Sequence, residues 1–390
     1  MRIAVGGNWA ACGENGMRRL LIALLVAPLC GCDSVFGPKD EGGTVPLAND
    51  ARPNNGPVIR EWTMRPLPRD QANFLILGDW GCSNKDQRMV ARAAAEYVAG
   101  TGLQFNGVLT TGDNMYEKLP GGVRDKLFQT IFEDAYDAER LNFPFYMTLG
   151  NHDYDFDTIK HVLQYPREYP QSRWKLPAKW YRLDLPEGNP LVTALMLESD
   201  RNKVTRAEWA KETAWLEEEL SRPRKAPWLL CVAHHSLFSN GPHEDNAVLQ
   251  IEWGPMVKEA DVDFYIGAHD HDLQHLQING WRTTFVLSGG GGREQKPEHR
   301  DDRGPFSRVL FGFAHMQFFA DRVVARYISA KDGQIVHEFI RWRDGRVEVV
   351  STTPSDKASR KQLYTGVFDE SEKGTPHLPS ASPDPAPHEK

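Results

Sequence analysis

The sequence predicts an α/β fold with mixed β-sheets, and three observations support this prediction. Of the 390 residues, 40% are hydrophobic and 25% are charged, a composition typical of a globular protein with a large core. Short apolar runs recur along the chain, and each ends in a glycine or a polar cluster, as buried strands do. Helical stretches lie between the first runs, whereas the last third is strand after strand with hairpin turns. That combination favours mixed sheets over a purely parallel one.

The expected strands and helices follow in order. The first strands are assigned to Phe74–Leu77, Val108–Thr110, Phe145–Leu149, Trp228–Val232, Phe264–Ile266 and Thr284–Leu287. Residues 86–99 are rich in alanine and predict a helix. Thr205-Arg-Ala-Glu208 forms a capping box before a second helix that carries Trp209, Leu216 and Leu220 on one face. The last strands are assigned to Ala314–Phe319, Val323–Ile328, Val336–Trp342 and Val347–Val350, with a hairpin turn at Lys331-Asp332-Gly333.

The N-terminal segment has the features of a bacterial lipoprotein signal peptide. Met17-Arg18-Arg19 precedes the apolar run Leu20–Leu29, which is shorter than the roughly 20 residues that span a bilayer. The sequence Leu29-Cys30-Gly31-Cys32 then resembles a lipobox, with Gly31 before the cut. We therefore predict a signal peptide over 1–31, lipidation of Cys32, and an exported protein anchored to a bacterial membrane, on the periplasmic side or the cell surface. An ordinary signal peptide with incidental cysteines is the alternative.

The mature chain divides by composition. Residues 32–70 carry six prolines and little apolar periodicity, which predicts a tether. Residues 351–390 carry another six prolines and few large apolar side chains, which predicts a disordered tail. One dense domain, residues 71–350, lies between them.

Charge and cysteine content exclude two classes of protein. The net charge is −7, so no broad cationic field exists for a nucleic-acid backbone, and we expect no nucleic-acid partner. Five cysteines in 390 residues exclude a disulfide-stapled fold.

Polar side chains follow five of the predicted strands at the point where each strand ends. These segments are Gly78-Asp79-Trp80-Gly81, Gly112-Asp113-Asn114-Met115-Tyr116, Gly150-Asn151-His152-Asp153, Ala233-His234-His235 and Gly267-Ala268-His269-Asp270-His271. Ligands bind at the carboxyl ends of strands in open α/β sheets. Each segment alone is a weak signal, because a lone Gly-Asp is common in turns and a lone His-x-His is more often a surface pair. All five in order point to one composite site.

This series resembles the motifs of the calcineurin-like metallophosphoesterases over nearly the whole of residues 73–345. The usual first motif, Asp-x-His, is replaced by Asp79-Trp80-Gly81, and Tyr116 completes Gly-Asp-x-x-Tyr. This exchange of histidine for tyrosine resembles the purple acid phosphatases, and local stretches resemble their small, mammalian-type (tartrate-resistant) branch. Ala268 departs from the family's glycine. The resemblance implies a four-layer sandwich of two mixed β-sheets flanked by helices, with residues 71–350 as the catalytic domain.

The resemblance also implies a binuclear metal centre. Its first metal would be held by Asp79, Tyr116 and His271, its second by Asn151, His235 and His269, with Asp113 bridging both. Two carboxylates and a phenolate favour Fe(III) at the first position, and the more neutral second set favours a divalent Fe, Zn or Mn. Of two adjacent histidines, His235 fits the family pattern Val-x-x-His. We therefore expect His234 to pack behind the ligands.

Three further residues are expected to act on the substrate. His152 is assigned to phosphate orientation and leaving-group protonation, and Asp153 to pairing with His152 and raising its pKa. An ordinary turn aspartate is the alternative for Asp153. His243 resembles a substrate-loop histidine of the family. The glycine run 289–292 is predicted to be a turn near the metals.

The resemblance implies an acid phosphatase that hydrolyses small phosphomonoesters by attack of metal-bound hydroxide, and the predicted signal peptide implies that it is exported. A divalent-metal phosphodiesterase or nucleotidase on the same fold is the alternative. A non-catalytic binding protein is disfavoured because all seven expected ligands and His152 are present. We expect a monomer whose only membrane contact is the lipid on Cys32.

Overall fold

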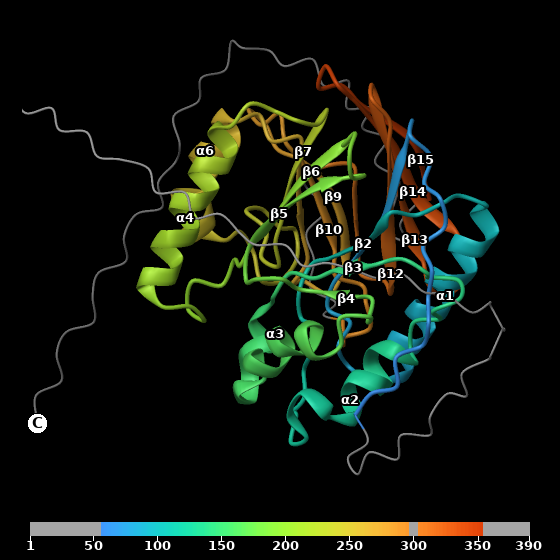
Figure 1. Cartoon of the computed structure of the whole chain (residues 1–390). Helices are drawn as coiled ribbons and strands as arrows, with labels where there is room; N and C mark the ends of the chain where they lie inside the picture. Colours follow the sequence, from blue (N-terminus) through green and yellow to red (C-terminus); the bar gives the residue numbers. More distant parts are fainter. Residues whose placement is uncertain (1–55, 296–302, 354–390) are drawn as a thin grey trace, which may run out of the picture. The chain divides into compact units, whose positions relative to one another are not determined.

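The computed structural model describes residues 56–295 and 303–353 (Figure 1). The predicted signal peptide with Cys32, most of the predicted tether and nearly all of the predicted tail lie outside these residues. Within the described ranges, no helix combines the length and the apolar character needed to cross a membrane.

The first sheet has eight strands in the order β15-β14-β13-β12-β1-β2-β3-β4. Their bounds are β1 Ala72–Leu77, β2 Gly107–Thr110, β3 Phe145–Tyr146, β4 Trp174–Lys175, β12 Gly312–Phe318, β13 Arg322–Ser329, β14 Ile335–Trp342 and β15 Val347–Thr352. Strands β1 to β4 run parallel, and β12 joins β1 antiparallel with Phe74 opposite Met316. From β12 to β15 every pairing is antiparallel.

The second sheet has seven strands in the order β11-β9-β10-β8-β7-β6-β5. Their bounds are β5 Tyr181–Leu185, β6 Val192–Met196, β7 Trp228–Val232, β8 Phe264–Gly267, β9 Leu273–Gln277, β10 Thr284–Ser288 and β11 Phe306–Arg308. The central strands β6, β7, β8 and β10 are parallel, whereas β5, β9 and β11 pair antiparallel at the edges. Both sheets are therefore mixed, as the sequence predicts.

Helices flank the two sheets. The longer ones are α1 Lys85–Thr101, α3 Ile159–Glu168 and α4 Arg206–Ser221, and the shorter ones are η1 Gly122–Arg124, α2 Lys126–Phe128, η2 Gln129–Glu133, η3 Asn151–Asp157, α5 Ala247–Glu252 and α6 Gly254–Glu259. The α1 helix begins where the Asn84 side chain accepts from the Gln87 backbone N–H, and it ends at Gly102 in a left-handed conformation. The capping box predicted for α4 is present, with Thr205 and Glu208 each bonded to the other's backbone N–H.

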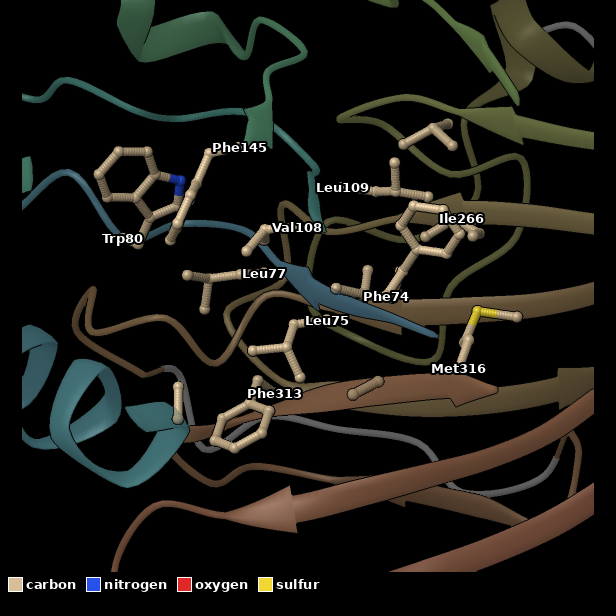
Figure 2. Packing of buried hydrophobic residues seen from close by; sticks show 14 of the residues in the cluster. Phe74, Leu75, Leu77, Trp80, Val108, Leu109, Phe145, Ile266, Phe313 and Met316 are labelled. Carbon is tan, nitrogen blue, oxygen red and sulfur yellow. The ribbon is translucent and has the colours of Figure 1, made fainter. Parts of the chain in front are cut away.

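The main core lies between the two sheets. Phe74 of β1 and Phe264 of β8 both contact the ring of Phe318, at centroid distances of 6.0 and 6.1 Å, so aromatic packing joins the sheets directly. Figure 2 shows Ile266 of the second sheet close to Phe74 and Met316 of the first. A second cluster lies under α4, where the rings of Trp209 and Trp253 stack at 4.8 Å.

The third strand is shorter than the predicted Phe145–Leu149. Only Phe145–Tyr146 forms the ladder of β3. Beyond it, the Thr148 hydroxyl donates to the backbone carbonyl of Thr110 at 2.7 Å, and the Thr148 N–H donates to the Thr110 hydroxyl. Side-chain hydrogen bonds thus replace the backbone ladder just before Gly150, where the chain enters the site.

Candidate metal centre

The candidate site is built from the carboxyl ends of five parallel strands. Loops after β1, β2 and β3 of the first sheet and after β7 and β8 of the second bring polar side chains together. These side chains are Asp79, Asp113, Tyr116, Asn151, His152, His234, His235, His269 and His271. Because both sheets contribute their strand ends, the site lies where the two sheets meet.

A first group of donors surrounds two buried carboxylates. The Tyr116 hydroxyl lies 3.0 Å from Asp113 Oδ2 and 3.3 Å from Asp79 Oδ1. His271 Nε2 is 3.7 Å from Asp79 Oδ1. Both aspartates are fully buried, so three oxygens and one imidazole nitrogen converge out of contact with bulk solvent.

A second group of donors shares Asp113 with the first. His234 Nε2 lies 3.0 Å from Asn151 Oδ1, 3.0 Å from His269 Nδ1 and 3.5 Å from Asp113 Oδ2. Two sets of potential metal ligands overlap here, one of Asp79, Asp113 and His234 and one of His234, His235 and His269. His234 belongs to both sets.

The position of His234 differs from the one expected. We predicted that it packs behind the ligands, but its ring reaches into the centre. Its Nδ1 lies 2.8 Å from the Thr111 carbonyl, which can only accept, so Nδ1 carries the proton and Nε2 presents a lone pair to the centre. His235 Nδ1 instead lies 3.0 Å from the Ser199 hydroxyl, and its ring packs on His269 with centroids 4.4 Å apart.

Backbone strain is concentrated in this site. Asp79, Asp113, His269 and His271 have φ values of 58°, 53°, 76° and 54°, in the left-handed region that residues other than glycine rarely adopt. Each such conformation costs about 1–3 kcal/mol and persists where the surrounding structure enforces it. Gly150 permits the close approach, because a Cβ there would lie 2.3 Å from Asp113 Oδ1.

The electrostatics of the site fit bound cations. Burial and the neighbouring Asp113 raise the pKa of Asp79 well above its usual value. Burial lowers the pKa of His234 and of His235 to about 3, so both are neutral donors at any physiological pH. Among the described residues, the ion pairs of Asp79 and Asp113 involve histidines and no lysine or arginine. Buried carboxylates beside neutral nitrogen donors, with no lysine or arginine paired to them among the described residues, are the donor set of a metal site.

His152 lies at the open side of the site. Its backbone N–H donates to Asp113 Oδ1 at 2.9 Å, and its ring lies 4.6 Å from that of Tyr116. One third of its side chain is exposed, at 33%. His152 Nδ1 is 2.7 Å from Asp155 Oδ2, and the other oxygen of Asp155 is 3.1 Å from Lys203 Nζ.

The predicted pairing of His152 with Asp153 is therefore wrong. The Asp153 carboxylate is fully buried and accepts from the Gly150 N–H at 2.8 Å and from Asn114 Nδ2 at 2.9 Å. It ties the loop after β2 to the loop after β3. Asp155 takes the expected role because one helical turn of η3 brings the third residue after His152 back to its side.

Comparisons with known proteins identify the family to which this site belongs. The sequence profile of the calcineurin-like phosphoesterase family matches residues 72–273. Purple acid phosphatase 17 of Arabidopsis thaliana is 30% identical over 282 residues, which cover 69% of this chain and 80% of the relative. The chain belongs to the calcineurin-like phosphoesterases, in their purple acid phosphatase branch. Human tartrate-resistant acid phosphatase type 5 is 28% identical over 290 residues, covering 66% of this chain and 87% of that protein.

Solved structures share the fold of this phosphoesterase. GAP50, described as the anchor in the inner membrane complex of Plasmodium, superposes with a TM-score of 0.62 at 21% identity, covering 69% of this chain and 88% of its own. The purple acid phosphatase PPD1 of yellow lupin superposes with a TM-score of 0.55 at 17% identity, covering 76% and 58%. These likenesses confirm the predicted pair of mixed sheets flanked by helices. Family membership places the chain among hydrolases of phosphoric esters.

His243, predicted to be a substrate-loop histidine, and the glycine run 289–292, predicted to be a turn near the metals, also lie at the site. His243 packs its ring on His269 at a centroid distance of 4.0 Å, and its N–H donates to Asp270 Oδ1 at 2.8 Å. The glycine run packs against the first motif, where a Cβ on Gly289 would lie 2.4 Å from Asp79 Oδ2.

Sequence reasoning missed the residues that support the site from unpredicted segments. Ser199 and Lys203 follow β6, a strand that was not predicted, so nothing placed them near His235 or Asp155. The signal for Asp155 was present, because it stands one helical turn after His152 in the sequence.

Proposed function

We propose that this chain is an acid phosphatase that hydrolyses small phosphomonoesters at a binuclear, iron-containing centre. The observation that carries the proposal is the Tyr116 hydroxyl, within hydrogen-bond distance of both Asp79 and Asp113. A phenol buried between two carboxylates matches the donor set of a hard trivalent cation. The names of the related purple acid and tartrate-resistant acid phosphatases support the same activity.

The ligand sets that we propose differ from the sequence prediction at one position. Asp79, Asp113, Tyr116 and His271 would hold Fe(III). Asp113, Asn151, His234 and His269 would hold a divalent Fe, Zn or Mn, with Asp113 common to both. We place His234 in the second set instead of His235 because its Nε2 contacts both Asn151 and His269, whereas the hydrogen bond of the His235 ring is to Ser199.

The chain's own residues have distinct parts in the reaction. When bound, the metal pair neutralises charge on the phosphate and activates water for in-line attack. His152 faces the substrate with Nε2, because Asp155 engages its Nδ1, and it donates a proton to the leaving oxygen. Lys203 holds Asp155 in place. His243 contacts the substrate from the loop that packs on His269.

The experiment that tests this function compares two substrates. Purified protein is assayed with p-nitrophenyl phosphate and with bis(p-nitrophenyl) phosphate between pH 5 and 8, with Asp113→Ala as the inactive control. The proposal expects a higher kcat/KM for the monoester and a better rate at the acid end. A preference for the diester would support the divalent-metal phosphodiesterase instead, and no turnover of either ester would refute the phosphatase.

We also propose that the protein is exported and anchored by lipid on Cys32. The arginine pair, the short apolar run and the Gly31-Cys32 junction support this location. In the bacterial host, Cys32→Ser should stay unlipidated and leave the membrane fraction. Incorporation of a fatty-acid label that persists in Cys32→Ser, with Cys30→Ser as the matched control, would contradict the proposed lipidation site.

A further inference from the structure

One cation is fixed on the metal site without having a part in the function described so far. The Arg293 guanidinium lies over the Tyr116 ring, 4.5 Å from its centroid. The ring of His152 packs on the same tyrosine at 4.6 Å. Arg293 and His152 therefore share one neighbour, and that neighbour's hydroxyl contacts both buried aspartates.

The backbone around Arg293 is held on two sides. Its N–H donates to the Asp79 carbonyl at 3.1 Å, and the Gly291 N–H donates to the Gly78 carbonyl at 3.0 Å. From the other side, Asn84 Nδ2 donates to the Gly292 carbonyl at 2.9 Å. These bonds attach the glycine run to the first motif and to the start of α1. The position of the arginine is thus set by the same segment that presents Asp79.

Among the described residues, no carboxylate forms an ion pair with the Arg293 guanidinium, whereas Arg303 pairs with Asp245 at 2.8 Å. Arg293 is only partly buried, so its guanidinium over the Tyr116 ring stays accessible to a ligand. A half-buried guanidinium beside an anion-binding site is an anion-recognition group.

We propose that Arg293 binds terminal oxygens of the substrate phosphoryl group and selects monoesters over diesters. The inference rests on the proposed phosphatase function. A monoester carries three terminal oxygens at any pH, and its charge approaches −2 above its second pKa of about 6, so the esters are compared at pH 7. A diester carries two terminal oxygens and a charge of −1. The planar guanidinium of arginine can donate to two phosphoryl oxygens at once. The monoester offers one more terminal oxygen and more negative charge than the diester, so Arg293 should strengthen binding of the monoester more.

The test uses three variants of the metal-loaded protein. Arg293→Ala removes the fork and the charge, Arg293→Lys keeps the charge alone, and Arg92→Ala removes a surface cation of α1 as the control. For Arg293→Ala, kcat/KM for p-nitrophenyl phosphate should fall about 10- to 100-fold, the effect of losing charge-assisted hydrogen bonds. The value for bis(p-nitrophenyl) phosphate should fall less than about fivefold. Arg293→Lys should be intermediate, and Arg92→Ala should match the wild type.

Calorimetric titration with inorganic phosphate gives a second readout that needs no turnover. The phosphate Kd of Arg293→Ala should rise about tenfold or more while its metal content stays that of the wild type. An equal loss for both esters, an unchanged phosphate Kd, or loss of metal from the variant would each overturn the inference. If the wild type hydrolyses neither ester, the phosphatase proposal fails, and the phosphate titration still decides whether Arg293 binds the anion.

Discussion

At the scale of the residue, the chemistry of this site depends on which atom of each side chain faces the centre. His234 and His235 are adjacent and belong to the same cluster of potential metal ligands, although His234 is fully buried and His235 only partly so. Both are held at Nδ1, His234 by Thr111 and His235 by Ser199. They differ at Nε2, because that of His234 lies 3.0 Å from both Asn151 Oδ1 and His269 Nδ1. A sequence pattern registers the presence of a histidine and not the direction of its ring.

This difference gives a direct prediction about the two histidines. His234→Ala should lose one of two bound metal ions, because it removes a donor nitrogen from the second set. His235→Ala should keep two ions, with metal affinity reduced about tenfold, as for a residue that supports a ligand. Plasma mass spectrometry of both purified variants measures this. Two ions in His234→Ala and one in His235→Ala would restore the assignment made from the sequence.

Substitutions of Asp153 and of Asp155 should also have different effects on substrate hydrolysis. Asp155→Asn should slow hydrolysis of glycerol 2-phosphate roughly 100-fold more than that of p-nitrophenyl phosphate, because an alkoxide needs protonation to leave and nitrophenolate does not. Asp153→Asn should affect both substrates alike, since Asp153 ties two loops together and does not contact His152. The ratio of kcat values for the two substrates is the measurement. Selective loss in Asp153→Asn alone would contradict the pairing seen here.

At the scale of the element, the apolar runs predicted the strands that present the ligands. Trp228–Val232 has the predicted bounds, and β1, β2 and β8 differ from prediction by at most two residues at either end. Their side chains are almost all buried, so hydrophobicity alone reveals them. The third strand was overextended because the Thr110–Thr148 hydrogen bonds, which end its ladder, join residues far apart in the sequence. The left-handed turns at Asp79 and Asp113 were equally invisible, because tertiary packing enforces them.

The capping box of α4 provides the prediction at this scale. Thr205→Ala should destabilise the fold by about 1 kcal/mol in urea at pH 7, since an N-cap acceptor is lost. The hydrogen bonds from Lys179 and Thr205 lower the pKa of Glu208 to about 2. Its stabilising contribution is therefore present above the usual glutamate pKa and is lost as the pH falls toward 2. Ser221→Ala at the other end of α4 should change stability by less than about 0.5 kcal/mol. Equal effects of both substitutions would show that the box is not needed.

At the scale of the whole molecule, buried neutral histidines oppose acid stability. His315 lies between Tyr97 and Asn73, and burial lowers its pKa to about 3. His275 and His337 join the two sheets through a 2.9 Å hydrogen bond, and burial lowers the pKa of His337 to about 3 as well. The unfolded chain binds protons at these positions near pH 6.5, whereas the folded chain does not. Protonation of these histidines in the unfolded chain therefore opposes folding as the pH falls below 6.5.

The lowered histidine pKa values predict how the free energy of unfolding changes with pH. Each buried histidine should lower the free energy of unfolding as the pH decreases from 6.5 toward 3, by up to about 1.4 kcal/mol per pH unit. His315→Gln should reduce this slope, because glutamine keeps a polar side chain at the site but does not titrate. Urea unfolding of both proteins at pH 7, 6, 5 and 4 measures the slope. An equal slope in the wild type and in His315→Gln would contradict the burial argument.

The most direct test of the central claim is the visible absorption spectrum of the oxidised protein and of Tyr116→Phe. The Tyr116 hydroxyl contacts both aspartates, so as a phenolate bound to Fe(III) it should give a coloured charge-transfer band in the wild type. Phenylalanine keeps the ring that both Arg293 and His152 contact and deletes only the oxygen. We predict a coloured wild type and a colourless, folded variant with weaker iron retention. A colourless wild type, or a variant with an unchanged band, would contradict the assignment of Tyr116 as an iron ligand.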